Sequence, residues 1–251
     1  MDRVGGGRSV EAALGKYDPM ITEEHPDIGW VAALADVSEK RAAAAVESAV
    51  GERRLFRDLS KEHRSEGRSF YIEIEAPLEL YALVRLLRPR HVVEVGVSSG
   101  VSSAYLLQAL DRNGAGTLHS VDLPKWEKTS PGSRRSTVSW SIPPGRFSGW
   151  AVPWSLRGRW DLRIGDKAVV LPLIAEELSR IDLFVYDVPH SDPRAFEEFQ
   201  SVDRRFPAGS VALVDHGGSQ EICPSLRRWA RARGSRAIRR ADLGLGGFRA
   251  H

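Results

Sequence analysis

The sequence predicts an α/β protein built on a doubly wound, mainly parallel, seven-stranded sheet. Two observations carry this prediction. Short apolar segments alternate with helical segments from residue 91 to residue 233, and this alternation is typical of a parallel sheet with helices on both faces. The first apolar segment also leads directly into a glycine-bracketed turn and a helix, a connection that α/β folds use repeatedly.

The expected elements follow from composition and periodicity along the chain. Strands are expected at 91–95, 117–123, 160–166, 181–187 and 210–216, and two late segments, 235–241 and 244–250, suit a closing antiparallel pair. Helices are expected between them at 101–111, 154–158, 168–179, 193–204 and 221–233. Before the first strand, residues 76–89 form an amphipathic helix, with Pro77 in its first turn and Pro89 beyond its end.

The chain of 251 residues is long enough for one substantial domain with an appendage. From Asp27 to about Arg64, alanine, leucine, glutamate and arginine recur with helical spacing. We therefore expect residues 1–70 to be an N-terminal helical extension or cap, and residues 71–251 to be the α/β domain.

Composition narrows the setting in which the protein works. No apolar run approaches the roughly 18 residues that span a bilayer, so no membrane partner is expected. The N-terminus lacks the apolar core of a signal peptide. The single cysteine, Cys223, cannot form an internal disulfide, which favours a reducing, cytoplasmic location. We expect Cys223 to act as a small apolar residue.

An arginine-rich segment, residues 225–240, allows two interpretations. It could bind the phosphates of RNA or DNA. It could also be the solvated face of an amphipathic helix, with Leu226, Trp229 and Ala230 facing inward. Because no nucleic-acid motif accompanies it, the solvated face is favoured, and a nucleic-acid partner is not excluded.

The residues that could bind a ligand or take part in catalysis lie where the expected strands end. The first strand contains Glu94 and runs into the turn Gly96–Gly100, which includes Ser98. In doubly wound sheets, ligands bind beyond the carboxyl ends of the strands. Asp122, 22 residues after Gly100, suits an acid that accepts hydrogen bonds from ribose hydroxyls. The acids and the histidine at the ends of the later strands are Asp122, Asp166, Asp187, Asp215 and His216.

The motifs EVGVSSG, GWAVP, SVD, IGD, DLFVYDVPHS and ALVDH together resemble class I S-adenosylmethionine-dependent methyltransferases. The resemblance covers about residues 71–251 and is greatest to the small bacterial O-methyltransferase-like group. It implies a Rossmann-like methyltransferase fold with S-adenosyl-L-methionine as cofactor. The rival dinucleotide-binding motif, G-x-G-x-x-G, is absent. By resemblance, the cofactor-binding residues are Glu94, Gly96, Ser98, Gly100, Asp122, Asp166 and Asp187.

The resemblance also implies a catalytic arrangement like that of catechol-type methyltransferases. In it, Asp187 and Asp215 would hold a divalent cation and His190 would be the general base. His216 stands where those enzymes have asparagine, and imidazole suits manganese, iron or zinc better than magnesium. We therefore expect the site to bind magnesium, another divalent cation, or no metal. The plainer alternatives are a helix cap for Asp187, a loop hydrogen bond for His190, and arginine partners for Asp215 and His216. His91 and His119 are expected to be structural.

The expected function is O-methylation of a small-molecule hydroxyl. Two alternatives stay open: methylation of RNA or protein, and a methyltransferase-like binding or scaffold protein without activity. The loop at 124–149 suits either a lid over the acceptor or an insertion. The sequence also leaves a homodimer open.

Overall fold

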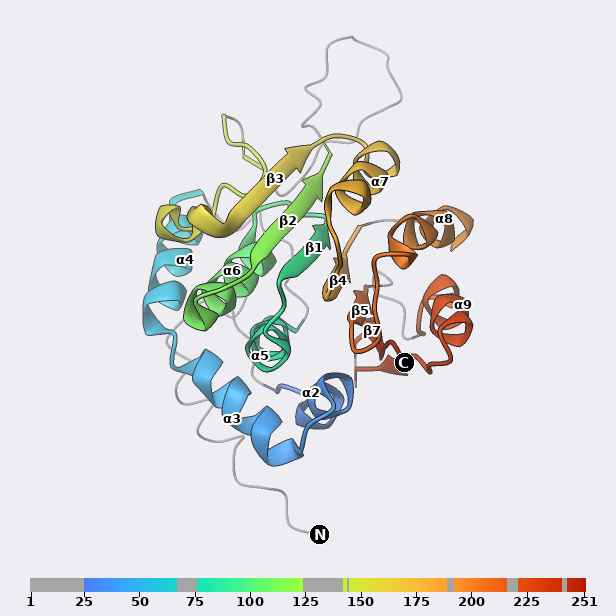
Figure 1. Cartoon of the computed structure of the whole chain (residues 1–251). Coiled ribbons are helices and arrows are strands. Elements are labelled where there is room, and N and C mark those ends of the chain that lie inside the picture. Colours follow the sequence, from blue (N-terminus) through green and yellow to red (C-terminus); the bar gives the residue numbers. More distant parts are fainter. Residues whose placement is uncertain are drawn as a thin grey trace.

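The computed structural model describes residues 25–66, 76–123, 142–143, 145–188, 192–215, 221–240 and 243–251. These residues contain a seven-stranded sheet in the order β3-β2-β1-β4-β5-β7-β6 (Figure 1). β1 to β5 are parallel, whereas β7 runs antiparallel to both β5 and β6. The strands are β1 (His91–Val95), β2 (Thr117–Asp122), β3 (Trp160–Ile164), β4 (Leu183–Tyr186), β5 (Val211–Val214), β6 (Ile238–Arg239) and β7 (Gly246–Arg249). The predicted fold class and the closing antiparallel pair are confirmed.

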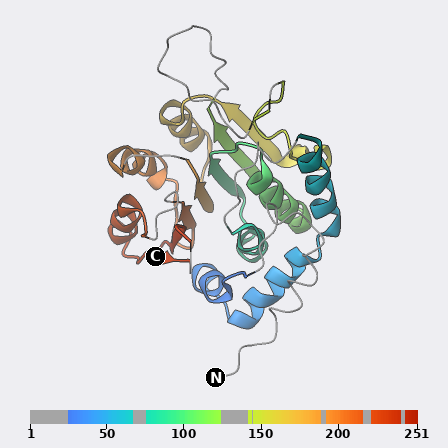
Figure 2. The ribbon, with the colours of Figure 1, turned by 180° about the vertical axis from the view of Figure 1, so that it is seen from behind.

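Helices cover both faces of this sheet, as Figures 1 and 2 show from opposite sides. One face carries α2 (Ile28–Ala35), α3 (Glu39–Val50), α4 (Arg53–Glu66), α5 (Pro77–Leu87) and α6 (Val101–Asn113). The other carries α7 (Lys167–Glu177), α8 (Asp192–Asp203) and α9 (Pro224–Ala232). Successive residues of β1 serve different layers: Val92 joins the core on the α6 side, and Val93 joins the core on the α7 side. The sheet is therefore the middle of three layers.

Four of the five parallel strands end earlier than the sequence suggested, and β2 does so by one residue, at Asp122. β3, β4 and β5 stop at Ile164, Tyr186 and Val214, before the acids that follow them. Asp166 leaves the strand because its carboxylate caps α7, where Oδ1 accepts a hydrogen bond from Ala168 N at 2.9 Å. The acids thus lie in the connections that leave the sheet.

The N-terminal helices pack onto the α/β core. A buried ion pair joins α5 to the β6–β7 hairpin: Arg240 Nε lies 3.1 Å from Glu79 Oε1. The same oxygen accepts a hydrogen bond from Asp27 N, just before α2, at 2.9 Å. Trp30 and Phe56 belong to the same apolar cluster as α5 and α6. The predicted boundary at residue 70 lies outside the described residues and stays a prediction.

The arginine-rich helix α9 turns its apolar side inward, as expected. Leu226, Trp229 and Ala230 are all buried. Trp229 packs against aromatic rings of the core and donates from Nε1 to Asp203 Oδ1 at 2.7 Å. Cys223, which precedes the helix, is also buried. Among the described residues, no helix is long and apolar enough to cross a membrane.

Candidate functional site

The candidate site lies where the order of the strands reverses, between β1 and β4. The loop after β1 is anchored on both sides of this point. Gly96 N donates to Val121 O in β2 at 2.9 Å, and Asp187 N, just after β4, donates to Val95 O at 2.8 Å. Doubly wound sheets bind ligands at such reversal points because the outgoing loops diverge there.

Two glycines give this loop its shape. Gly96 has φ +94°, and a Cβ at this position would lie 1.9 Å from the carbonyl oxygen of Asp187. Gly100 has φ +87°, and its Cβ would lie 2.7 Å from the Cα of Gly149. Both the left-handed backbone and the close contacts exclude a side chain. The Gly-x-x-x-Gly spacing therefore reflects two tight backbone approaches.

Asp122 is tied to the same loop. Its Oδ2 accepts a hydrogen bond from Ser98 N at 3.1 Å. Ser98 itself has φ +53°, so the loop turns sharply at this residue. The Asp122 side chain remains partly exposed at the carboxyl end of β2. The structure thus brings together Gly96, Ser98, Gly100 and Asp122.

Glu94 lies behind this loop, inside the core. Its side chain is buried in β1 and accepts three hydroxyl hydrogen bonds, from Ser102 at 2.9 Å, Ser103 at 2.7 Å and Ser120 at 2.6 Å. Burial raises the pKa of Glu94 to about 7, although the three serines oppose the rise. The carboxyl joins β1 to β2 and to the first turn of α6.

The remaining predicted acids lie along the same edge of the sheet. Asp166 and Asp187 are exposed, and Asp215 is partly exposed after β5. Tyr186 pairs with Val214 in the ladder, so Asp187 and Asp215 leave adjacent strands at the same level. His190 and His216 lie outside the described residues. In the described part of the chain, no group of three or more His, Cys, Asp and Glu could hold a metal ion.

A segment before β3 is hydrogen-bonded to the glycine loop, residues 96–100. Gly149 N donates to Ser98 O at 2.8 Å, and Ala151 N donates to Ser99 O at 2.9 Å. The expected helix at 154–158 is present as a 3₁₀ helix, η3 (Trp154–Arg159). From η3, Arg157 Nη2 donates to the carbonyls of Gly149 at 2.9 Å and Val152 at 3.1 Å.

Arg157 was not singled out from the sequence. Its guanidinium lies 5.3 to 5.7 Å from the ring centroids of Phe147, Trp154 and Trp160. The interleaving of arginine with aromatic residues was visible in residues 146–160, but it does not reveal which backbone carbonyls the arginine binds.

Three further residues were also missed. Lys167, Tyr186 and Glu198 form a largely buried hydrogen-bonded cluster next to Asp166 and Asp187. Burial and the neighbouring Glu198 raise the pKa of the Tyr186 phenol, so it stays protonated. Only the order Asp166-Lys167, with a charged residue directly after a strand-end acid, hinted at this cluster.

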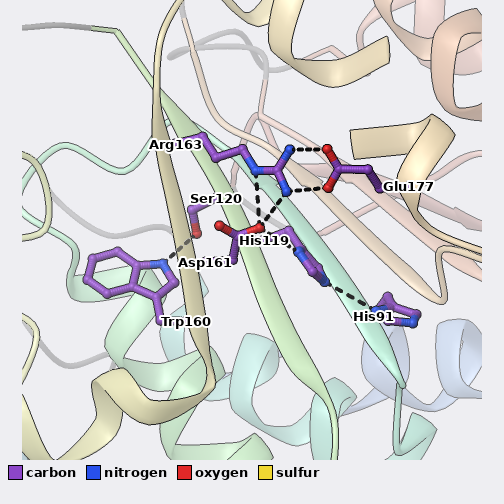
Figure 3. Close-up of polar contacts among 7 residues, drawn as sticks. All are labelled: His91, His119, Ser120, Trp160, Asp161, Arg163 and Glu177. Atoms are coloured by element: carbon purple, nitrogen blue, oxygen red, sulfur yellow. Dashed lines mark hydrogen bonds and ion pairs between the residues drawn. The ribbon is translucent and has the colours of Figure 1, made fainter. Parts of the chain in front are cut away.

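His91 and His119 lie away from the site, at the amino halves of β1 and β2 (Figure 3). His91 Nδ1 lies 3.2 Å from His119 Nε2, and His119 Nδ1 lies 3.1 Å from Asp161 Oδ2. Arg163 bonds both Asp161 and Glu177, which extends the chain of contacts to α7. These contacts support the structural role expected for both histidines.

Comparison with known proteins fits this geometry. Residues 93–216 match the family model described as a methyltransferase domain. By this match, residues 93–216 are identified as a methyltransferase domain. The matched segment begins inside β1 and ends just after β5, so it includes the glycine loop and every strand-end acid.

Solved structures show the same fold for the methyltransferase. The O-methyltransferase TomG from Streptomyces achromogenes, in complex with S-adenosylmethionine, superposes with a TM-score of 0.50 at 17% identity, covering 79% of this chain and 90% of TomG. The S-adenosylhomocysteine-bound methyltransferase PaMTH1 from Podospora anserina gives a TM-score of 0.51 at 11% identity, covering 85% and 97%. No curated protein matches the sequence significantly.

Proposed function

We propose that this methyltransferase moves the methyl group of S-adenosylmethionine to a hydroxyl of a small molecule. One observation carries the proposal: the glycine loop Gly96–Gly100 lies at the strand reversal, with carboxylates at the ends of the strands on either side. Asp122 lies on one side and Asp187 on the other. The neighbours TomG and PaMTH1, which bind the cofactor or its product, share this fold.

The residues present fit the cofactor. S-adenosylmethionine combines a cationic methionine part with a ribose and an adenine. The narrow glycine turn lets the backbone approach the methionine part, and the partly exposed Asp122 carboxylate suits the two ribose hydroxyls. Asp166 caps α7 with Oδ1 and stays exposed, which leaves it able to face the adenine amino group.

The acceptor side is proposed from Asp187, His190, Asp215 and His216. When bound, a divalent cation would polarise the acceptor oxygen and lower the pKa of its hydroxyl. Asp187 and Asp215 would hold it, because they leave neighbouring strands at one level, with His216 as the third ligand. His190 would take the acceptor proton, as its ordinary pKa of about 6.5 suits a general base near neutral pH.

Calorimetry tests the cofactor assignment. The wild type should bind S-adenosylmethionine and S-adenosylhomocysteine, and Asp122→Ala should abolish or greatly weaken both. The matched control is Asp58→Ala, which removes a partly exposed helical acid whose ion pair with Arg54 is 3.7 Å long. If the wild type binds neither compound, the proposed enzyme function is wrong.

Methyl transfer from radiolabelled S-adenosylmethionine to a panel of hydroxylated small molecules tests the reaction. We expect His190→Gln to lower kcat about 10²- to 10⁴-fold, as for loss of a general base. EDTA should lower activity, added manganese should restore it, and Asp215→Ala should abolish that restoration. Full activity in excess EDTA would refute the metal. Cofactor binding without turnover on any acceptor would favour a scaffold.

A nucleic-acid substrate is the remaining outcome of this test. Salt-sensitive retention of RNA, lost when Arg227, Arg228 and Arg231 become alanine, would favour it. One of these arginines already has a contact within the protein, because the Arg228 guanidinium lies 3.8 Å from the ring centroid of Phe196.

A further inference from the structure

Two buried side chains and one partly buried lysine, from three elements, meet next to the candidate site. Lys167 is the first residue of α7, Tyr186 is the last residue of β4, and Glu198 lies in α8. The Lys167 ammonium lies 2.5 and 2.6 Å from the two oxygens of Glu198 and 2.9 Å from Tyr186 Oη. Tyr186 Oη in turn donates to Glu198 Oε2 at 2.5 Å. Each of the three ammonium hydrogens and the phenol hydrogen therefore has an acceptor within the cluster.

Such a cluster is an inefficient source of stability. Removing a carboxylate and an ammonium from water carries a large desolvation penalty, and well-packed apolar residues often stabilise a protein as much. Charged hydrogen bonds are directional, however, and they fix the relative positions of the elements that carry them. The arrangement therefore points to a geometric role.

The position of the cluster shows what it would fix. Lys167 directly follows Asp166, the proposed adenine-side acid, and Tyr186 directly precedes Asp187, the proposed acceptor-side acid. Glu198 belongs to α8, which begins two residues after His190 in the sequence. The cluster thus connects the elements that carry both ends of the proposed site.

We propose that Lys167, Tyr186 and Glu198 are positioning residues that hold Asp166 and Asp187 at a fixed separation. In this role they orient the adenine end of the cofactor and the methyl acceptor relative to one another. The inference rests on the proposed function and adds residues that touch neither ligand. Because a misplacement of about 1 Å can slow an enzyme about 10²-fold, loosening this cluster should affect turnover strongly.

A second cluster in the same chain provides a matched control. Tyr81 Oη donates to Glu52 Oε1 at 2.8 Å, and Arg112 Nε lies 2.7 Å from the same oxygen. This set has the same chemistry, tyrosine with glutamate and a cation, but it joins the N-terminal helices to α5 and α6. Tyr81→Phe and Tyr186→Phe each remove one buried hydroxyl and should lower the melting temperature by similar amounts.

The two variants should differ in function. With the acceptor that the wild type methylates fastest, we expect Tyr186→Phe to lower kcat tenfold or more with little change in acceptor KM. Tyr81→Phe should leave kcat within twofold of the wild type. In calorimetry, Lys167→Met should weaken S-adenosylhomocysteine binding about tenfold, and Lys167→Arg should restore most of it. Equal kcat values for the two tyrosine variants, with unchanged binding in Lys167→Met, would overturn the inference.

Two further measurements keep the test decisive. If a single variant does not fold, the double variant Lys167→Met with Glu198→Leu removes both charges together, and it should fold while showing the same functional losses. A stable double variant with wild-type kcat and affinity would overturn the positioning role. If the wild type itself does not bind S-adenosylhomocysteine, the proposed function fails first, and this result is distinct from unaffected variants of a binding-competent wild type.

Discussion

Replacing Glu94 with glutamine should remove a pH-dependent loss of stability. The Glu94 carboxyl is buried in β1, and burial raises its pKa from 4.5 to about 7. The three serine hydroxyls that it accepts from stabilise the charged form only in part. The folded protein therefore holds a proton on Glu94 over a pH range in which the unfolded chain has already lost it.

The size of the effect follows from that range. The contribution of Glu94 to the free energy of unfolding is greatest below pH 4.5. It declines as the pH rises to about 7 and then levels off. At about 1.36 kcal/mol for each pH unit, the total decline is on the order of 3 kcal/mol. Glutamine has no proton to lose, and its amide can still exchange hydrogen bonds with serine hydroxyls.

Urea unfolding of the wild type and Glu94→Gln at several pH values from 4.5 to 8.5 measures this difference. Other groups titrate alike in both proteins, so they cancel when the two free energies of unfolding are subtracted. We expect the wild type to lose up to about 3 kcal/mol relative to the variant across this range. Ser103→Ala, which removes one hydroxyl that lowers the pKa of Glu94, should extend the decline to higher pH without changing where it begins. A difference that stays flat or rises with pH would refute the reasoning.

Three further predictions concern the loop, the histidine pair and the core. Gly96→Ala should abolish S-adenosylmethionine binding or folding, because the new Cβ would lie 1.9 Å from the carbonyl oxygen of Asp187. The control Gly114→Ala has open space around it and should lower the free energy of unfolding in urea by only about 1 kcal/mol. Burial and the facing His119 lower the pKa of His91 below 6.5, so the unfolded chain is protonated first as the pH falls. His91→Gln should therefore lose less stability than the wild type between pH 7 and pH 5, and equal losses would contradict this. Trp229→Ala should cost about 3–5 kcal/mol in urea unfolding, because it empties a buried aromatic site; a cost below about 1 kcal/mol would contradict the packing described.

The sequence was most informative where structure is local. β1 agrees with the expectation at both ends, because a run of β-branched residues bounded by Pro89 and Gly96 marks a buried strand. β4 and β5 were expected to include Asp187 and Asp215, yet both strands stop one residue earlier. Composition does not show where a ladder ends, since that depends on which neighbour supplies the next hydrogen bond.

Only part of the candidate site's arrangement was predictable from the sequence. The glycine spacing and the strand-end position identified Gly96, Gly100 and Asp122 as neighbours. That Glu94 would be enclosed by Ser120, 26 residues away, could not be read from spacing. His190 and His216 remain predictions.

By itself, the sequence determined the order of the elements and the doubly wound fold class. These properties follow from periodicity and from short motifs, whose physical causes act within a few residues. Only the tertiary structure decided which distant side chains share a hydrogen bond. Lys167 bonds Glu198, which lies 31 residues further along the chain. Arg240 bonds Glu79, from which it is separated by 161 residues. Such pairs depend on how helices pack across a sheet, because burial makes their contacts specific and costly to leave unmade.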